Sequence, residues 1–181
     1  MRRLILGSGL VTGLYALVVR GDLALDVGVG RRVRVLGPQE IHIHAPRDVV
    51  FEVISGPYLR TPRAMRAKLE VLERGADMVL AAHHTPVAFG LTATTTETVR
   101  FEPPGRIEFR LVRGPVPHVS ETFELREEGE KTELVYTGEL GTDLWALGER
   151  WGVLVARSWE KTVAASLAST KEEAERRAGR R

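Results

Sequence analysis

The distribution of apolar residues constrains the fold of this chain more than any other feature. Between residues 69 and 140, short segments alternate apolar and polar side chains, with turn residues between the segments. From residue 143 onward, a stretch of about thirty residues instead repeats apolar side chains every three or four positions. Alternation predicts strands with one buried face, and the longer repeat predicts a helix with one buried side. A sheet with one apolar face has to be covered, and this helix is the long amphipathic element that can cover it.

The expected order of elements is one strand, a short helix, six strands and a long helix. Residues 39–45 alternate as a half-buried strand, and Pro46 suits the first turn of a helix that Gly56 and Pro57 end. Short connections favour antiparallel pairing of the six later strands. Those strands are expected at residues 69–74, 78–85, 89–101, 107–112, 119–125 and 132–140. Thr142 or Asp143 is expected to cap the long helix, whose predicted buried stripe contains Leu144, Leu147, Trp151, Leu154, Val155, Ser158, Thr162, Ala165 and Leu167.

Composition excludes several kinds of site without indicating a function. With 181 residues, of which 43% are hydrophobic and 28% charged, the chain is expected to form one globular domain. It contains no cysteine, which excludes disulfides and thiolate metal sites, and 26 basic against 24 acidic residues do not indicate nucleic-acid binding. His42 and His44 share the strand face that points away from the apolar positions, so we expect both imidazoles in water and no metal site. We expect no cofactor either, because the glycine-rich residues 7–13 are not followed by the repeated βαβ pattern of a dinucleotide site.

The first twenty residues differ from the remainder of the chain. Arg2 and Arg3 precede an uncharged run, residues 4–19, which Arg20 closes. As a helix, this run would span about 24 Å, short of the ~30 Å hydrocarbon core of a membrane. Three interpretations stay open: a cleaved signal peptide, a short membrane anchor, and a helix that packs on its own domain or on a partner. We favour the anchor, because the flanking arginines can extend toward the headgroups.

Residues 21–38 are rich in glycine and arginine and are expected to form a linker, and residues 171–181 are almost wholly charged and are expected to form a tail. The arginines of the linker could contact anionic lipid headgroups, or they could simply be solvated. The arginines from residue 20 to residue 34 outnumber those before the apolar run. If residues 4–19 anchor the protein to a membrane, the positive-inside rule therefore places the domain in the cytoplasm.

Local sequence pieces accompany this order of elements. They are Ile41-x-Ile43-x-Ala45-Pro46-x-x-x-Val50-Phe51-x-x-Ile54 near the start, and Glu121-Thr122-Phe123-Glu124-Leu125 and Thr132-x-Leu134-x-Tyr136 before the long helix. With them, residues 39 to about 170 resemble the SRPBCC superfamily of helix-grip proteins, which includes START, Bet v 1 and polyketide cyclase/dehydrase-like proteins. The resemblance implies an α+β fold, in which a curved seven-stranded antiparallel sheet wraps around a long C-terminal helix and a short helix precedes it. It also implies a deep cavity for an apolar small molecule, but no catalytic residue, since the superfamily has no universal catalytic motif.

Glu121 is the first candidate residue for that cavity. It shares strand parity with Phe123 and Leu125, so its side chain is expected to face inward. A buried carboxyl group without a partner is costly, so we expect either a raised pKa or a nearby cation, for which Arg157 of the long helix is a candidate. The alternatives are a structural ion pair and exposure at a strand end.

Further candidates follow from the same alternation and from the resemblance. His83 and His84 are adjacent in one strand and point to opposite faces, so one of them could bind a ligand or act as a base. Tyr136 could offer a hydroxyl group to a ligand, although core packing also explains it. The other expected ligand-binding residues are Phe109, Phe123 and Trp151 on the cavity wall and, by the resemblance, Arg60 and Arg63 at its mouth.

We expect this protein to bind or transfer an apolar or amphipathic small molecule, such as a lipid, a quinone or a polyketide-like ring system. The sequence contains no G-x-S-x-G elbow, Walker loop or H-E-x-x-H motif, which argues against an enzyme. The alternative is a cyclase or dehydratase that uses Glu121, Tyr136 and one of the two adjacent histidines, because a shaped pocket with one or two polar groups can suffice. A third hypothesis is an interaction module without a ligand, or a stress-related regulator, either of which predicts a filled core. The expected partners are an apolar ligand and, through residues 4–19, a membrane; the oligomeric state stays open.

Overall fold

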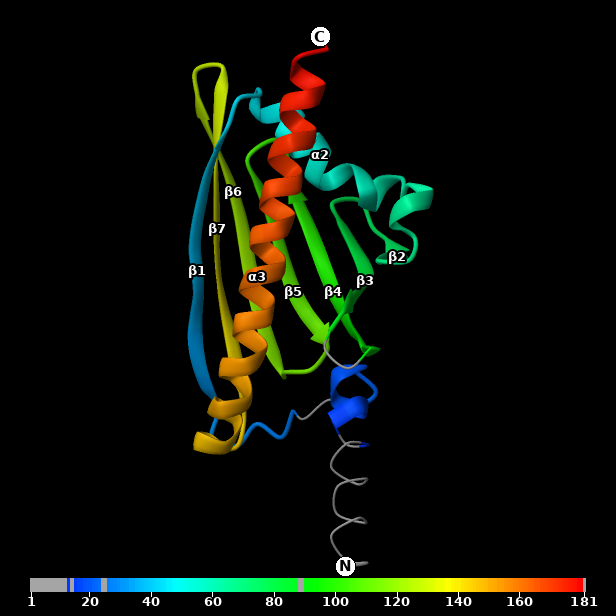
Figure 1. Cartoon of the computed structure of the whole chain (residues 1–181), viewed down its shortest axis with the longest axis vertical. Helices are drawn as coiled ribbons and strands as arrows, with labels where there is room; N and C mark the ends of the chain where they lie inside the picture. Colours follow the sequence, from blue (N-terminus) through cyan, green and yellow to red (C-terminus); the bar gives the residue numbers. More distant parts are fainter. Residues whose placement is uncertain (1–12, 14, 24–25, 88–89, 181) are drawn as a thin grey trace, which may run out of the picture.

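The computed structural model describes residues 13, 15–23, 26–87 and 90–180, and these form an α+β fold (Figure 1). Seven strands pair antiparallel in the order β1-β7-β6-β5-β4-β3-β2, and one long helix, α3, lies across one face of the sheet. The strands are β1 (Arg32–Ile43), β2 (Leu69–Arg74), β3 (Met78–Pro86), β4 (Thr92–Glu102), β5 (Arg106–Arg113), β6 (His118–Glu128) and β7 (Lys131–Thr142). The helices are α2 (Arg47–Leu59) and α3 (Trp145–Ala178), with a 3-10 turn at Arg63–Met65. The predicted helix-grip fold is confirmed.

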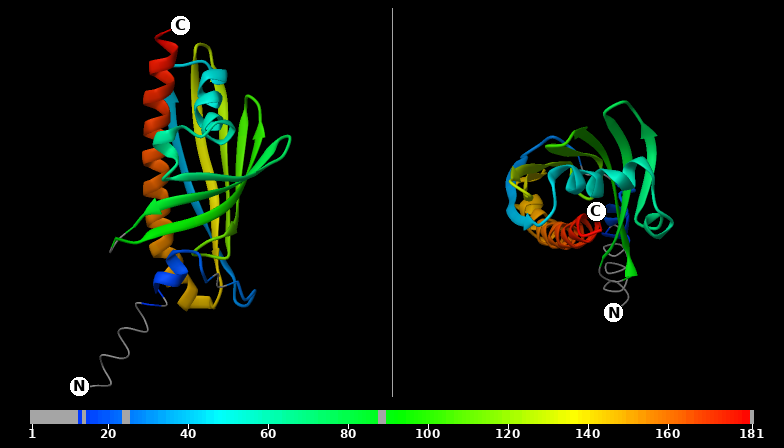
Figure 2. Two further views of the ribbon diagram at one scale, coloured as in Figure 1. Left: turned by 90° about the vertical axis from the view of Figure 1, so that its right-hand side faces the viewer. Right: turned by 90° about the horizontal axis from the view of Figure 1, so that it is seen from above.

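The sheet bends around α3, as views across and along the helix show (Figure 2). Its concave face carries the apolar side chains that strand alternation predicted, and Ile107, Leu125 and Leu134 are almost completely buried there. The helix packs against β1, β7 and α2, whereas its contacts with β3 and β4 are few. The β3–β4 side of the concave face is therefore less covered than the β1–β7 side.

β1 begins at Arg32 rather than at residue 39, so the second half of the predicted linker is a strand. It pairs with β7 on both sides of an irregularity between Leu36 and Gln39. Gly37 in this irregularity has a φ of +77°. A glycine followed by a proline predicts a break in the chain, but an edge strand such as β1 accommodates both residues in a bulge.

α2 also extends further than predicted, through Gly56 and Pro57 to Leu59. Pro57 lacks the backbone donor that would otherwise bond to the Val53 carbonyl, and the helix continues for only two residues beyond it. The Arg60 backbone N–H donates to the Gly56 carbonyl at 2.9 Å, and the Thr61 hydroxyl group donates to the Pro57 carbonyl at 3.0 Å. These bonds satisfy two of the four carbonyl groups that lack a partner at the end of the helix.

α3 differs from the prediction in its start, its end and its buried side. Leu144 precedes it with a φ of 70° and no side-chain cap, so neither Thr142 nor Asp143 caps the helix. It continues to Ala178 through most of the predicted tail, and Glu173 pairs there with two arginines of the last turns. The buried residues are Gly152, Ala156, Val163, Leu167 and Ala174, whereas Leu147 and Leu154 are 70% and 60% exposed. The predicted stripe is wrong for these leucines, because periodicity selects bulky residues and the close approach of helix and sheet selects small ones.

The described part of the N-terminal segment, residues 15–23, packs against the domain (Figure 1). It begins with a helical turn in which Val18 and Val19 are buried. Most of the predicted membrane anchor, residues 4–19, lies outside the described residues. Among the helices that the structure describes, none is both long and apolar enough to cross a membrane.

Candidate functional site

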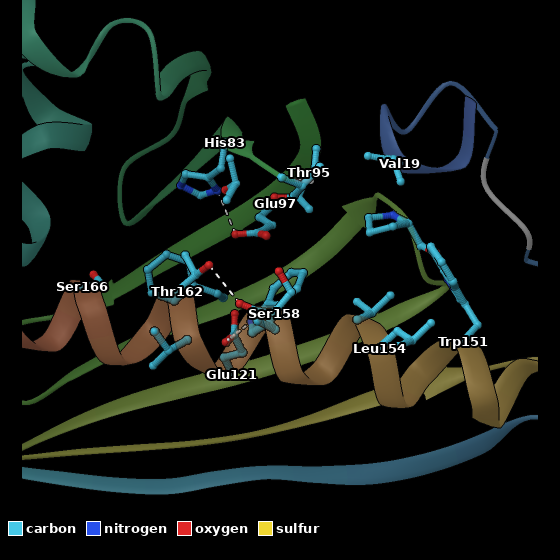
Figure 3. A pocket seen from close by; sticks show the side chains of 18 of the residues that line it. Val19, His83, Thr95, Glu97, Glu121, Trp151, Leu154, Ser158, Thr162 and Ser166 are labelled. Atoms are coloured by element: carbon cyan, nitrogen blue, oxygen red, sulfur yellow. Dashed lines mark hydrogen bonds and ion pairs between the residues drawn. The ribbon is translucent and has the colours of Figure 1, made fainter. Parts of the chain in front are cut away.

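A cavity of about 450 Å³ lies between the sheet and α3 (Figure 3). Side chains of β3 to β6 line one side, α3 lines the other, and Tyr15 and Val19 of the N-terminal segment reach its wall. Most of the wall is apolar. The carboxyl groups of Glu97 and Glu121 and the imidazole of His83 are the strongly polar groups that project into it.

The cavity opens along one side of α3. Leu154, Ser158, Thr162 and Ser166 follow one another at four-residue spacing, so they form a row on one face of the helix (Figure 3). All four side chains line the cavity and are also exposed. Sequence periodicity assigned three of them to the buried stripe, because it cannot distinguish a side chain at the edge of an opening from one in the core.

Glu121 projects from β6 into the cavity, as its strand parity predicted, and is 5% exposed. Its Oε1 atom accepts hydrogen bonds from the Tyr136 hydroxyl group and from Trp159 Nε1, both at 2.6 Å. Tyr136 belongs to β7 and Trp159 to α3, so both layers hold the carboxyl group. The predicted contact with Arg157 is wrong: that side chain is exposed, because two residues before Trp159 place it on another side of the helix.

Burial raises the pKa of the Glu121 carboxyl group to about 7, and the charge of Glu97 acts in the same direction. The hydrogen bonds from Tyr136 and Trp159 oppose this rise, because they stabilise the charged form. Burial and the neighbouring Glu121 also raise the pKa of the Tyr136 hydroxyl group, so that group remains a donor. At neutral pH the cavity therefore contains a carboxyl group near its titration midpoint.

A second polar chain runs through His83. Its Nδ1 lies 2.9 Å from Glu97 Oε2, and its Nε2 lies 2.9 Å from the Tyr58 hydroxyl oxygen. When Nδ1 donates to Glu97, Nε2 accepts from Tyr58. Burial raises the pKa of the Tyr58 hydroxyl group, and the charges of Glu97 and Glu121 add to this effect. Both ring nitrogens are thereby engaged within the protein, and a ligand that reaches His83 has to replace one of these contacts.

Aromatic rings form a large part of the wall. The ring centroids of Phe109 and Phe123 are 5.4 Å apart on neighbouring strands. Trp151 Nε1 donates to the Pro115 carbonyl at 2.8 Å, and its ring meets Tyr15 edge-on at 6.0 Å. Phe109, Phe123 and Trp151 all line the cavity, and their contact with a ligand stays a prediction.

Several candidate residues lie away from the cavity. His84 points to the opposite face of β3, where its Nδ1 lies 3.2 Å from the Thr94 hydroxyl oxygen. Arg60 and Arg63 are exposed beyond the end of α2 and do not line the cavity, so their expected place at its mouth is wrong. Tyr136 is fully buried behind the wall and supports Glu121 without lining the cavity itself.

Sequence reasoning missed three polar groups of the site. Glu97 is 5% exposed and shares parity with Thr95 and Val99, so alternation within its threonine-rich strand was a usable signal. Tyr58 lies in the part of α2 beyond its predicted end. The spacing of Trp159 within the predicted helix indicates only core packing, and it does not reveal that the indole N–H donates a hydrogen bond to Glu121.

The structure contains no group of three or more His, Cys, Asp or Glu side chains that could hold a metal ion, among the residues it describes. His42 is exposed, as strand alternation predicted, with its Nδ1 3.2 Å from Glu128 Oε2. His44 is exposed as well, and its backbone N–H donates to Glu175 at 3.0 Å. These contacts are typical of surface histidines.

Comparisons with known proteins agree with this architecture. The family model described as polyketide cyclase/dehydrase and lipid transport matches residues 38–175. The aromatase/cyclase Zhui from Streptomyces sp. R1128 superimposes with a TM-score of 0.67 at 24% identity, over 81% of this chain and 95% of that chain. A truncated norcoclaurine synthase from Thalictrum flavum has a TM-score of 0.61 at 15% identity, over 80% of this chain and 94% of that chain. No curated protein matches the sequence. At these identities the two structures share the fold alone.

Proposed function

The chain belongs to the polyketide cyclase/dehydrase and lipid transport family, and from that membership we propose that it binds an apolar or amphipathic small molecule in the cavity beneath α3. A lipid, a quinone and a polyketide-like ring system fit this description. The observation that carries the proposal is a hollow of about 450 Å³ in a place where protein interiors normally pack closely. Side chains around a hollow lack contacts, and an apolar ligand supplies them. Glu121, Phe109, Phe123 and Trp151 are proposed to contact the ligand.

Binding rather than turnover is supported by the way the polar groups are held. Both ring nitrogens of His83 have partners within the protein, which leaves no lone pair ready to accept a proton from a ligand. The raised pKa of the Tyr58 hydroxyl group keeps it protonated, so it does not accept a proton from a ligand either. His83 and Tyr58 are therefore better suited to orienting a ligand than to changing it.

A variant that obstructs the opening tests the proposal. Ser158 lies in the exposed row beside the cavity, so Ser158→Trp would fill part of the hollow without entering the core. We expect this variant to bind the neutral fluorescent probe Nile red at least about tenfold more weakly than the wild type. Ala164→Trp is the matched control, because Ala164 is exposed on the same helix away from the cavity. Equal binding by wild type and Ser158→Trp would contradict the proposal, and native mass spectrometry of protein from its own host should reveal a bound small molecule.

We also propose that the N-terminal end associates with a membrane, with the domain on the cytoplasmic side. The uncharged run of residues 4–19 and the arginines after it support this. At the end of the molecule where residues 15–23 lie, α3 begins with Trp145 and Leu147, which are 57% and 70% exposed (Figure 1). Exposed apolar side chains gathered at one end are typical of a surface that meets a lipid or protein partner.

Vesicle flotation tests this association. The full chain should float with phosphatidylcholine vesicles that contain phosphatidylserine, and Leu147→Asp should reduce the floating fraction. Leu72→Asp is the matched control, since Leu72 is 50% exposed on β2, far along the sheet. A full chain that stays in the lower fractions would contradict membrane association and would leave the ligand proposal intact.

A further inference from the structure

The described part of the cavity wall carries acidic side chains but no arginine or lysine to balance them. Among the described residues that line it, Glu97 and Glu121 carry carboxyl groups, His83 carries an imidazole, and no arginine or lysine is present. A ligand carboxylate would bring another negative charge into a poorly hydrated space without a fixed cation to meet it. Taking a charge out of water into such a space is costly unless a partner of opposite charge meets it. The wall therefore disfavours anionic ligands.

Glu121 is the acid without a cation of its own. Glu97 lies 2.9 Å from His83, which can carry a positive charge. The hydrogen bonds to Glu121 come instead from neutral donors, Tyr136 and Trp159, and both of them end on Oε1. Neutral donors stabilise a carboxylate without cancelling its charge. Within the described part of the chain, the site therefore lacks one positive charge when Glu121 is ionised.

The aromatic rings around the Glu121 carboxyl group also favour a positively charged ligand. Phe109, Phe123 and Trp159 line the cavity beside Glu121, and the faces of aromatic rings attract cations. From the wall charges, the neutral donors on Glu121 and these rings, we infer that the cavity takes an apolar ligand bearing one protonated amine, which Glu121 receives, and rejects the corresponding carboxylate. This inference rests on the proposed function, because it names the chemical class of ligand for the same cavity.

The affinity for such an amine should depend on pH with a definite sign. The pKa of Glu121 is raised to about 7, first by burial and then by Glu97, so below neutral pH the group is protonated and cannot neutralise an ammonium ion. The other groups that face it are His83 on β3, Tyr136 on β7 and Trp159 on α3. Amine binding should therefore strengthen as the pH rises from about 6 to about 8.

Three probes with the same ring system test the inference on the full chain. They are naphthylethylamine, naphthylethanol and naphthylacetate, which carry an ammonium, a hydroxyl and a carboxylate group. We expect the amine to bind at least about tenfold more tightly than the alcohol at pH 8, and the carboxylate to bind at least about tenfold more weakly than the alcohol. Glu121→Gln should remove the preference for the amine over the alcohol. Glu139→Gln, an exposed acid on β7 beside His118, is the matched control for net charge and should preserve the preference.

The outcomes separate this inference from the proposal beneath it. Binding of the alcohol together with equal or tighter binding of the carboxylate than of the amine overturns the inference and leaves the ligand proposal standing. Failure of all three probes to bind contradicts both. An amine preference that persists in folded Glu121→Gln protein, judged by its circular dichroism spectrum, also overturns the assigned role of Glu121.

Discussion

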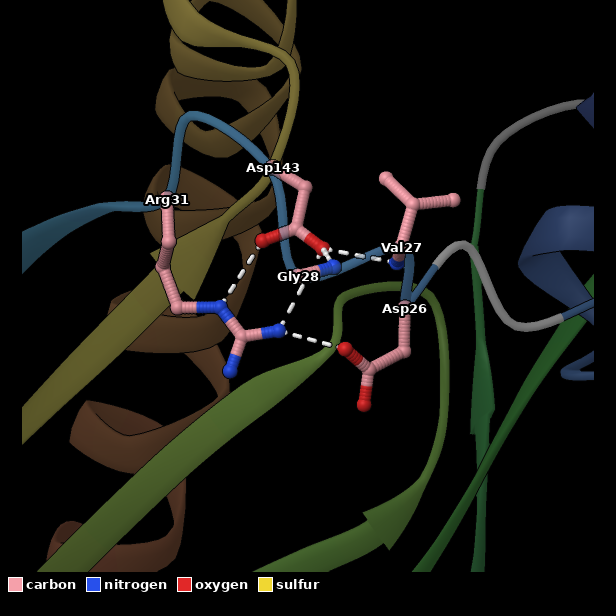
Figure 4. A network of polar contacts seen from close by, with 5 residues as sticks. All are labelled: Asp26, Val27, Gly28, Arg31 and Asp143. Carbon is pink, nitrogen blue, oxygen red and sulfur yellow. Dashed lines mark hydrogen bonds and ion pairs between the residues drawn. The ribbon is translucent and has the colours of Figure 1, made fainter.

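Two buried carboxyl groups, Glu121 and Asp143, are 5% and 4% exposed and have opposite surroundings. Asp143 Oδ2 accepts backbone hydrogen bonds from Val27 at 2.8 Å and Gly28 at 2.7 Å, and Oδ1 accepts from Arg31 Nε at 2.8 Å (Figure 4). Arg31 and these backbone groups lower the pKa of Asp143 to about 2, with the Arg31 hydrogen bond as the largest cause. At Glu121 the pKa moves the other way, to about 7.

Burial is the largest cause of the raised pKa of Glu121, whereas at Asp143 the hydrogen bond from the charged Arg31 outweighs the effect of burial. The Asp143 carboxylate accepts hydrogen bonds from the Arg31 guanidinium group and from two backbone amides, which together neutralise its charge. Both of its oxygens therefore already have partners within the protein. Glu121 has two neutral side-chain donors and a second carboxyl group nearby, and no guanidinium or ammonium group of the described residues is hydrogen-bonded to it. A buried acid with its own cation is typical of structure, and a buried acid without one is a better candidate for a ligand site.

The Asp143 cluster, which comprises Asp26, Val27, Gly28, Arg31 and Asp143, also has a place in the architecture (Figure 4). It ties the residues before β1 to the start of α3. Gly21 and Asp22 lie just before this cluster in the sequence, and their carbonyl oxygens accept hydrogen bonds from Arg113 at 2.6 and 3.0 Å. Together these contacts hold the segment whose Tyr15 and Val19 reach the cavity wall.

The largest effect is expected from Asp143→Asn, which removes the charge that Arg31 and the two backbone amides share. One of the amide hydrogens of asparagine would face donors, so residues 20–31 should detach from the start of α3. Limited proteolysis should cut this segment at least about a hundredfold faster than in the wild type.

Glu149→Gln is the matched control for this prediction. It breaks an ion pair with Arg32 on the same helix, but both side chains are about half exposed, and such pairs contribute little. If Asp143→Asn resists cleavage as well as Glu149→Gln does, the cluster is not what holds the segment, and the contrast with Glu121 fails.

Glu121→Gln should have the opposite consequence and make the domain more stable at neutral pH. The folded-state pKa is about 7 and the ordinary value is 4.5, so the protonated form favours folding below pH 4.5 and this contribution is lost as the pH rises through 7. Glutamine keeps a carbonyl acceptor for Tyr136 and Trp159 and does not ionise. The free energy of unfolding of the variant should therefore exceed that of the wild type by an amount that grows from pH 4.5 to 8 and reaches on the order of 2–3 kcal/mol.

Urea denaturation at several pH values measures this difference. Glu139→Gln controls for the loss of one negative charge, because Glu139 is half exposed and pairs with His118 on the surface. A difference between Glu121→Gln and wild type that stays constant with pH would contradict the raised pKa of Glu121.

The sequence predicts much of this contrast on the Glu121 side and almost none of it on the Asp143 side. Strand parity alone places Glu121 on the concave face, because period-two alternation is a local property. The partner Tyr136 depends on the register of β6 and β7, which is fixed by the short turn between Glu128 and Lys131 and places Phe123 opposite Tyr136. The pairing of Asp143 with Arg31 joins residues 112 positions apart, so the local pattern suggested only a helix cap.

The same distinction explains the other errors. The order of strands and the long helix followed from periodicity, which is repeated over many residues and tolerates single exceptions. The start of β1, the end of α2 and the buried side of α3 each depend on a few residues whose tertiary contacts override local preference. Three arginines, Arg60, Arg63 and Arg157, were predicted to lie at the cavity from their positions in the expected elements. Their side chains point into solvent instead, and none of them lines the cavity.

The smallest effect should distinguish the two neutral donors that hold Glu121. Tyr136→Phe removes a donor that is fully buried, and water cannot replace it behind the sheet wall. Trp159→Phe removes a donor at the half-exposed helix side of the cavity, where water can reach the carboxyl group. The pKa of Glu121 should therefore rise by about one unit in Tyr136→Phe and by roughly half a unit or less in Trp159→Phe. Carbon-13 NMR titration of the glutamate carboxyl groups measures both shifts, and a larger rise in Trp159→Phe would mean that the helix, rather than the sheet, controls the charge of Glu121.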